Sequence, residues 1–198
     1  FTHVHAADLT QKALDLTATR LELLNLKADL SIQNAEKTNF EDESFDHVNC
    51  QGVIHHTPYT DRAAREICRI LKPGGSASVS VYYRNIFLRA WPILRSLGWL
   101  ISLLGGKLKG RGREKIYRES NVDEIVRLYD GAENPIGKSY SKKQLFELLE
   151  PYFTVEETYL HFFPARSLPF KIPKFVHRFL DKRCGFMIYT TLRKKCAA

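Results

Sequence analysis

Asp8, Asn34 and the pair Gln51-Gly52 each stand just past a short run of apolar or alternating residues. Those runs, at 4–7, 30–33 and 45–50, have the length and composition of β-strands. In a parallel α/β sheet, the ligand crevice lies outside the carboxyl ends of the strands. A carboxylate and an amide there can form hydrogen bonds, and a glycine lets a ligand approach the backbone closely. We therefore expect these residues to border a ligand-binding crevice.

Two adjacent histidines, His55 and His56, follow the third of these strands and face the same expected crevice. An imidazole titrates near neutrality, so either ring could act as a general base or orient a substrate. The alternative is that both rings only line the pocket, with His56 near the ligand and His55 packed beneath it. Both interpretations stay open, because a reaction driven by the alignment of its reactants needs no base.

Length and composition are those of one ordinary globular domain. The chain has 198 residues, of which 44% are hydrophobic and 26% are charged, and this excludes disordered and collagen-like classes. No basic region followed by a long apolar run opens the sequence, so no signal peptide is predicted. The cysteines have no C-x-x-C pair and no spacing that suits zinc, so we expect reduced thiols and no metal site. They are Cys50, Cys68, Cys184 and Cys196.

The elements that must position these residues alternate as in a parallel α/β sheet. After Thr10, a candidate N-cap, apolar residues recur at helical spacing over 11–27, and a second helix is expected over 61–71. Pro73-Gly74-Gly75 ends that helix and forces a turn into an alternating strand at 76–83. This order of strands and helices predicts a mostly parallel sheet in the first 83 residues.

The second half of the chain contains further helices and strands. A helix is expected near 122–129, and Ser141 caps another over 142–150. Between the two helices, the residues at 130–135 form a turn. Alternating residues predict strands at 153–163 and 186–192, with a helix from 173 onward between them.

Charge divides the chain in two. Residues 1–83 carry 8 Lys and Arg against 11 Asp and Glu, whereas residues 84–198 carry 22 against 11. A basic excess of this size indicates either an anionic partner or a solvated basic face.

An apolar stretch at 86–106 lies within the basic half, and its longest uncharged run is too short to span a bilayer. One interpretation is an interfacial helix or lid that admits an apolar substrate, with Trp91 and Trp99 at the membrane interface. The other is a buried helical hairpin, broken at Pro92, that covers the sheet. RNA binding ranks lower, because the basic residues are interleaved with aliphatic rather than aromatic residues.

Five short motifs, in this order and spacing, resemble those of class I S-adenosylmethionine-dependent methyltransferases. They are Asp8-Leu9-Thr10, Asn34-Ala35-Glu36, the segment from Asp42 to Val48, GVIHHTP from Gly52 to Pro58, and EICRILKPGG from Glu66 to Gly75. The match covers residues 4–83, and the subgroup it most resembles is the ubiquinone/menaquinone C-methyltransferase-like set. The stretch at 129–141 resembles an insert of some members. The resemblance implies a Rossmann-like three-layer α/β sandwich with a helical insert, and S-adenosylmethionine as the cofactor.

The resemblance also implies a role for each motif. Asp8 would accept hydrogen bonds from both ribose hydroxyls, and Leu9 would pack on the adenine face. The segment Asn34, Ala35 and Glu36 would border the adenine edge, although many relatives have Asp where Asn34 stands. Gln51 and Gly52 would lie beside the methionine part of the cofactor, and the acceptor would rest between His55, His56 and the insert.

A first strand and a glycine-rich loop are expected before Asp8 in this family, where backbone N–H groups hold the cofactor's polar tail. The residues before Asp8 contain neither. We therefore expect an N-terminally truncated chain rather than one that has lost cofactor binding.

Together these observations predict a single methyltransferase domain over residues 1–198. Its parts would be a cofactor-binding core (1–83), a helical insert or lid (84–150) and C-terminal strands with a helix (151–198). We expect methyl transfer to a small or lipophilic acceptor in the cytoplasm, with membrane-peripheral contact through 86–113 and no nucleic acid.

Two other functions are weighed against methyl transfer. The first is a non-catalytic module that docks on a membrane or a partner and keeps only the fold. The second, a nicotinamide-dependent Rossmann enzyme, fits less well because the Pro-Gly-Gly turn and the HHTP segment have no role there.

Overall fold

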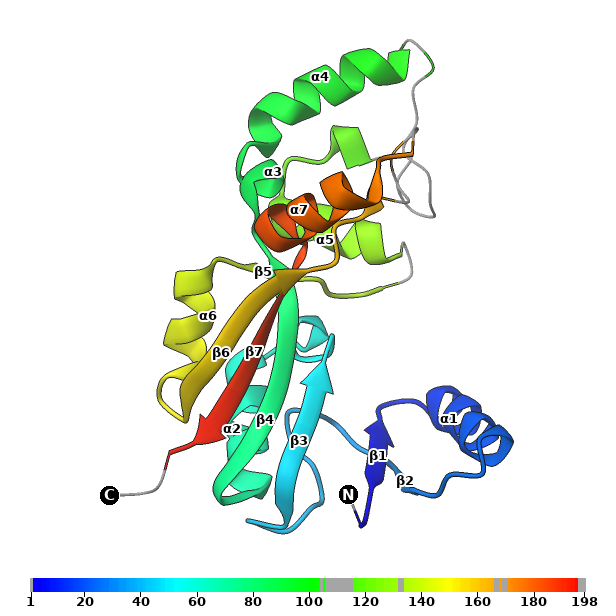
Figure 1. The fold of residues 1–198 in the computed structure, drawn as a ribbon, viewed down its shortest axis with the longest axis vertical. Coiled ribbons are helices and arrows are strands. Elements are labelled where there is room, and N and C mark those ends of the chain that lie inside the picture. The colour runs from blue at the N-terminus through cyan, green and yellow to red at the C-terminus, as the bar shows by residue number, and fades with distance from the viewer. Residues whose placement is uncertain are drawn as a thin grey trace.

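The computed structural model of the protein describes residues 2–103, 105, 116–131, 134–165, 168 and 171–195. Its strands form two separate ladders, and helices pack beside both of them (Figure 1). The basic residues at 107–113 and part of the expected turn at 130–135 lie outside the described residues.

The first ladder consists of β1 (His5–Asp8) and β2 (Asp29–Ile32), which α1 (Gln11–Leu23) connects. The two strands are parallel, with His5 opposite Asp29. Thr10 caps α1 as predicted, since its side chain accepts a hydrogen bond from a backbone N–H of the first turn. The helix ends at Leu23 rather than at residue 27, because Asn25 has a φ of +53°, in the left-handed region that stops a helix.

The second ladder has the order β3-β4-β7-β6, and β5 pairs with the end of β4. Its strands are β3 (Phe45–Gln51), β4 (Leu71–Tyr83), β5 (Ser139–Tyr140), β6 (Phe153–His161) and β7 (Met187–Lys194). β3 and β5 run parallel to β4, whereas β7 is antiparallel to both β4 and β6. The structure confirms the strands predicted near these positions, but β5 is too short to show an alternating pattern and is not among them.

The Pro73-Gly74-Gly75 segment forms an irregularity inside β4 rather than a turn before it. The pairing of β3 with β4 shifts register between Phe45 and His47. Gly74 has a φ of +69°, and a Cβ on Gly75 would lie 2.9 Å from the carbonyl oxygen of Lys72. The glycines are therefore needed for a tight backbone path, and the strand begins at Leu71 directly after the preceding helix.

The main hydrophobic core lies where α2 (Thr60–Ile70) and α6 (Lys142–Leu149) pack on the second ladder and on each other. The predicted inner face of α2 is confirmed, because Ala64 and Ile67 are buried there. The largest fully buried apolar side chains of this core come from the strands, α6 and the loop after β3: Phe153, Ile54, Leu71, Leu145, Leu149, Ile188 and Leu192.

The remaining helices lie beyond the end of β4, and α4 extends farthest from the sheet (Figure 1). They are α3 (Ile86–Arg89), α4 (Trp91–Leu103), the 3₁₀ turn η2 (Ile116–Arg118), α5 (Val122–Asp130) and α7 (Lys174–Cys184). A smaller core of Tyr82, Leu88, Ile116, Ile125, Val126 and Met187 joins this end to the sheet. Within the described residues, no helix has both the length and the apolar character required to cross a bilayer.

Two expectations for the apolar stretch need correction. The break falls at Ala90, before Pro92, because proline is tolerated in the first turn of a helix. Trp91 is half-buried against the smaller core, and its Nε1–H donates to the carbonyl oxygen of Glu119 at 2.8 Å, so it does not face a membrane. Trp99 is 52% exposed, as the interfacial interpretation requires.

The expected α/β class with a mostly parallel sheet is confirmed, since three of the five strand pairs are parallel. The strands nevertheless do not form one continuous sheet. In the described part of the chain, no pairing joins β1 or β2 to β3. The candidate site lies between these two ladders.

Candidate functional site

A cavity of about 630 Å³ lies between the first ladder and β3. Small-molecule sites commonly have volumes of roughly 300–1,000 Å³. Six of the seven residues predicted to bind the cofactor border it, namely Asp8, Leu9, Asn34, Ala35, Glu36 and Gly52, and so does His56. Gln51 is exposed at the end of β3, and His55 is buried; neither borders the cavity.

Asp8 stands at the junction of β1 and α1. Its Oδ1 accepts hydrogen bonds from the backbone N–H and the hydroxyl of Thr10, both at 2.9 Å. Among the described residues Oδ2 has no such partner, so it can accept a hydrogen bond from a ligand. The carboxylate is thus oriented by the start of the helix while keeping an acceptor for the cavity that it borders.

The turn after β2 is held by its own polar side chains. Asn34 Oδ1 accepts a hydrogen bond from the Glu36 N–H at 2.9 Å, which is an Asx-type turn. Glu36 Oε1 in turn accepts from the Tyr59 N–H at 2.7 Å, in the loop that follows β3. Glu36 therefore ties together two segments that border the cavity, and the Asn34 amide nitrogen is left to donate to a ligand.

Gly52 has a conformational reason to be glycine. Its φ is +75°, and a Cβ built there would meet nothing within 4 Å. Its N–H points to Ser80, whose Oγ and carbonyl oxygen lie at 3.0 and 3.2 Å. The left-handed backbone, rather than lack of room, requires glycine at this corner of the cavity.

His56 belongs to a polar network that long-range contacts assemble at the cavity. Its Nδ1 lies 2.6 Å from the carbonyl oxygen of Ile136, and its Nε2 lies 3.4 Å from Asp130 Oδ2. The Asn134 amide nitrogen also lies 3.1 Å from Nδ1, so carbonyl, amide and carboxylate groups contact the two ring nitrogens. The Tyr82 hydroxyl and the Asn134 amide donate to the two Asp130 oxygens at 2.8 and 2.7 Å.

His55 has a different environment from its neighbour. Its ring is 1% exposed and packs against Tyr82 and His56, with ring centroids 4.6 and 4.1 Å apart. Burial, aided by the adjacent His56, lowers the pKa of His55 to about 3, so the ring is neutral at pH 7. This placement agrees with the interpretation that His55 is packed beneath the pocket.

The apolar walls of the cavity were not predicted from the sequence. Phe40, Phe45 and Val48 border it, and the ring of His5 meets Phe40 edge-on at 4.7 Å. Phe40 lies in a loop, where no periodic pattern could indicate a buried face. Cys50 also borders the cavity, but burial raises the pKa of its thiol to about 12, which rules out a reactive thiolate at neutral pH.

Glu66, on α2, forms another part of the cavity wall. One of its oxygens accepts hydrogen bonds from the N–H and hydroxyl of Thr38, at 2.7 and 2.6 Å, and Arg69 binds both of its oxygens. Burial by itself raises the pKa of Glu66, but hydrogen bonds from Arg69 and Thr38 outweigh it and lower the pKa to about 2.

Comparisons with known proteins agree with this architecture. Residues 1–79 match the family model described as a methyltransferase domain. Phosphoethanolamine N-methyltransferase 2 of Caenorhabditis elegans is 37% identical over 81 residues, which are 40% of this chain and 18% of that protein. The ubiquinone/menaquinone biosynthesis C-methyltransferase UbiE of Laribacter hongkongensis is 30% identical over 108 residues, 54% of this chain and 42% of that protein. The chain thus spans less than half the length of either relative.

Similarity of fold extends beyond the matched residues. The crystal structure of a SAM-dependent methyltransferase from Methanosarcina mazei superposes with a TM-score of 0.61 at 19% identity, and covers 99% of this chain and 83% of that one. Residues 1–79, which provide most of the cavity, therefore match a methyltransferase domain, and the chain as a whole has the fold of S-adenosylmethionine-dependent methyltransferases.

Proposed function

We propose that the cavity binds S-adenosylmethionine and that the protein transfers its methyl group to a small or lipophilic acceptor. The observation that carries this proposal is the convergence of six residues from three separate motifs on one cavity. Comparisons with methyltransferases imply the same cofactor. When bound, it would supply a sulfonium methyl group for a nucleophile to attack, with S-adenosylhomocysteine as the leaving group.

The residues present fit such a ligand. Asp8 keeps a carboxylate oxygen for the ribose hydroxyls, and the 67% exposed side chain of Leu9 offers an apolar surface to the adenine face. The Asn34 amide and the backbone of Ala35 border the adenine edge, with Glu36 holding their turn. Gly52, and Gln51 next to it, would lie beside the methionine part.

Positioning is the main catalytic contribution expected of this chain. Transfer of a methyl group depends on the alignment of two reactants, which a preformed pocket provides. His56 borders the cavity, and Asp130 and Asn134 contact its ring from outside the cavity lining; the ring would orient the acceptor or remove its proton. His55, buried and neutral, would only support the ring of His56.

Replacing His56 by Asn tests whether the ring acts as a base. A positioning role predicts a raised KM with a small loss in kcat, whereas a base predicts a loss of about 10²-fold or more in kcat. The assay should follow methyl transfer to a demethylated quinone precursor, because the proposed subgroup acts on quinone rings. His177→Asn, the same substitution at a histidine of α7 that does not border the cavity, is the comparison variant.

Peripheral membrane contact through α4 is the second part of the proposal. Ile93, Leu97 and Leu100 recur at helical spacing and are 77%, 54% and 52% exposed, and Trp99 lies next to them. A continuous apolar helix face in a basic half of the chain suits the surface of an anionic bilayer. Such contact would bring a lipophilic acceptor to the insert.

Vesicle sedimentation tests this contact. Leu97→Ser with Trp99→Ser should reduce binding to anionic vesicles, while Leu23→Ser with Leu24→Ser, which changes two even more exposed leucines at the end of α1, should not. Equal binding by both double variants would contradict the contact through α4.

Calorimetric titration of S-adenosylhomocysteine into wild type and the α4 variant addresses the alternative, a non-catalytic docking module, which the exposed face of α4 favours. If the protein is an enzyme, the α4 variant keeps its affinity for S-adenosylhomocysteine. If it is only a docking module, wild type binds vesicles and has no affinity for S-adenosylhomocysteine.

A further inference from the structure

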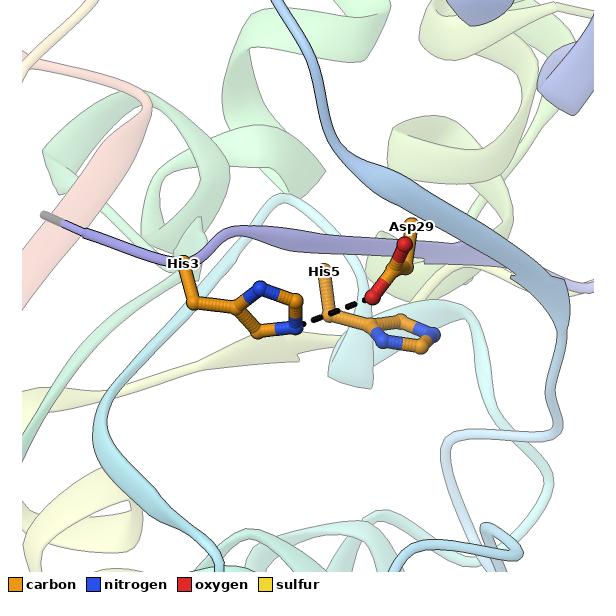
Figure 2. A group of neighbouring side chains, drawn as sticks. All are labelled: His3, His5 and Asp29. Atoms are coloured by element: carbon orange, nitrogen blue, oxygen red, sulfur yellow. Dashed lines mark ion pairs between the residues drawn. The ribbon is translucent and has the colours of Figure 1, made fainter.

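A cluster of three potential metal ligands lies at the start of the first ladder, at the opposite end of β1 from Asp8. It consists of His3, His5 and Asp29, and one ligand atom from each lies within 4.8 Å of the others (Figure 2). We infer that these residues form a binding site for a divalent transition-metal ion such as Zn²⁺. The described residues contain no second group of this kind.

Strand geometry accounts for the cluster. His3 and His5 are two residues apart in extended chain, where alternate side chains point to the same side. Asp29 is directly opposite His5 in the parallel pairing of β1 with β2. The backbone therefore brings side chains from β1, from the segment before it and from β2 to one place.

Distances suit a shared ion. Two ligand atoms that are each about 2.0–2.2 Å from one tetrahedral metal lie about 3.3–3.6 Å apart. His3 Nε2 and Asp29 Oδ2 stand 2.9 Å apart, so a slight separation of the two side chains would admit the ion. A ring nitrogen of His5 lies within 4.8 Å of both ligand atoms, and Ser31 Oγ, 2.9 Å from its Nε2, is a polar neighbour that can hold the ring.

The chemical types of these three ligands indicate which class of metal ion they would bind. Two imidazoles and one carboxylate suit Zn²⁺, Co²⁺ or Ni²⁺, whereas Ca²⁺ and Mg²⁺ prefer oxygen ligands throughout. Three protein ligands leave a position for water. The side chains of His3 and Asp29 are 73% and 61% exposed, so an ion can reach them from solvent.

Cysteine spacing could not reveal this site, because its ligands are histidines and a carboxylate from a different strand. A bound ion would join the segment before β1 to β2 and so stabilise a ladder of only two short strands. Without metal, the same residues form no more than an exposed His–Asp pair, which contributes little to stability.

The test is a calorimetric titration of Zn²⁺ into the metal-free, reduced chain, with the variants His3→Ala, Asp29→Asn and Asp15→Asn. Asp15 is an exposed carboxylate on α1, in the same part of the molecule, and serves as the matched control. We expect one ion per chain, with affinity reduced about tenfold or more in the first two variants and unchanged in the third. The affected positions are exposed, so these variants should fold, and circular dichroism checks this.

Co²⁺ spectroscopy separates this site from the cysteines. Binding at His3, His5 and Asp29 predicts visible cobalt bands without a thiolate charge-transfer band in the near ultraviolet. A thiolate band, equal affinity in all three variants, or no binding by wild type would each overturn the inference.

Discussion

Single residues at the cavity owe their roles to backbone geometry that the sequence partly reveals. Asp8, Asn34 and Gly52 could be predicted because each follows a strand, and the ends of parallel strands converge. The network around His56 could not be predicted in the same way. It joins residues about 80 positions apart in the sequence, and nothing in a local pattern indicates such contacts.

The backbone conformation of Gly52 predicts how substitutions of this single residue change stability. Replacing it with Ala should lower the free energy of unfolding by about 1 kcal/mol, because a Cβ is unfavourable at a φ of +75° although space is available. Gly52→Asn should cost less, since asparagine tolerates the left-handed region better. Urea denaturation measures both, and an Ala variant as stable as wild type would contradict the conformational requirement.

The lowered pKa of Glu66 predicts that the free energy of unfolding depends on pH. Its pKa falls from an ordinary value of 4.5 to about 2 in the folded protein, so the ionised form is favoured by folding. The contribution, on the order of 3 kcal/mol, is fully present above pH 4.5 and is lost as the pH falls toward 2. In Glu66→Gln, the stability difference from wild type should shrink through this window. A constant difference from pH 6 to pH 2.5 would disagree with the lowered pKa.

Helices and strands were predicted where a periodic pattern was strong. The amphipathic α2 and the alternating β4, β6 and β7 appear near their expected positions. The end of α1 was missed because apolar residues continue past Leu23, whereas the backbone turns at Asn25. Trp91 shows a second limit, since hydrophobicity does not distinguish an apolar side chain that packs inward from one that faces outward.

The N-terminus of α6 allows us to test how much the capping of one helix stabilises the protein. Ser141 and Gln144 form a reciprocal capping box, with the Ser141 Oγ accepting from the Gln144 N–H and the Gln144 side chain accepting from the Ser141 N–H. Ser141→Ala should therefore lower the midpoint of thermal unfolding by an amount equivalent to about 1 kcal/mol. Ser120→Ala, at an exposed serine outside any helix, is the control and should leave the midpoint unchanged.

At the scale of the whole molecule, two ladders and a cavity between them explain why separate motifs act together. Asp8 and Asn34 come from the first ladder and the turn after it, Gly52 follows a strand of the second, and His56 meets the insert through Asp130. The α/β class was predictable from the order of elements. The separation of the ladders was not, because no local pattern says which strand edges remain unpaired.

Calorimetric titration of S-adenosylhomocysteine into the full-length gene product tests the central claim most directly. We predict saturable binding that Asp8→Ala weakens by about tenfold or more, since hydrogen bonds to a charged group are lost, while Asp15→Ala leaves it unchanged. Absence of binding by wild type, or equal affinity in all three proteins, would contradict the assignment of the cavity to this cofactor.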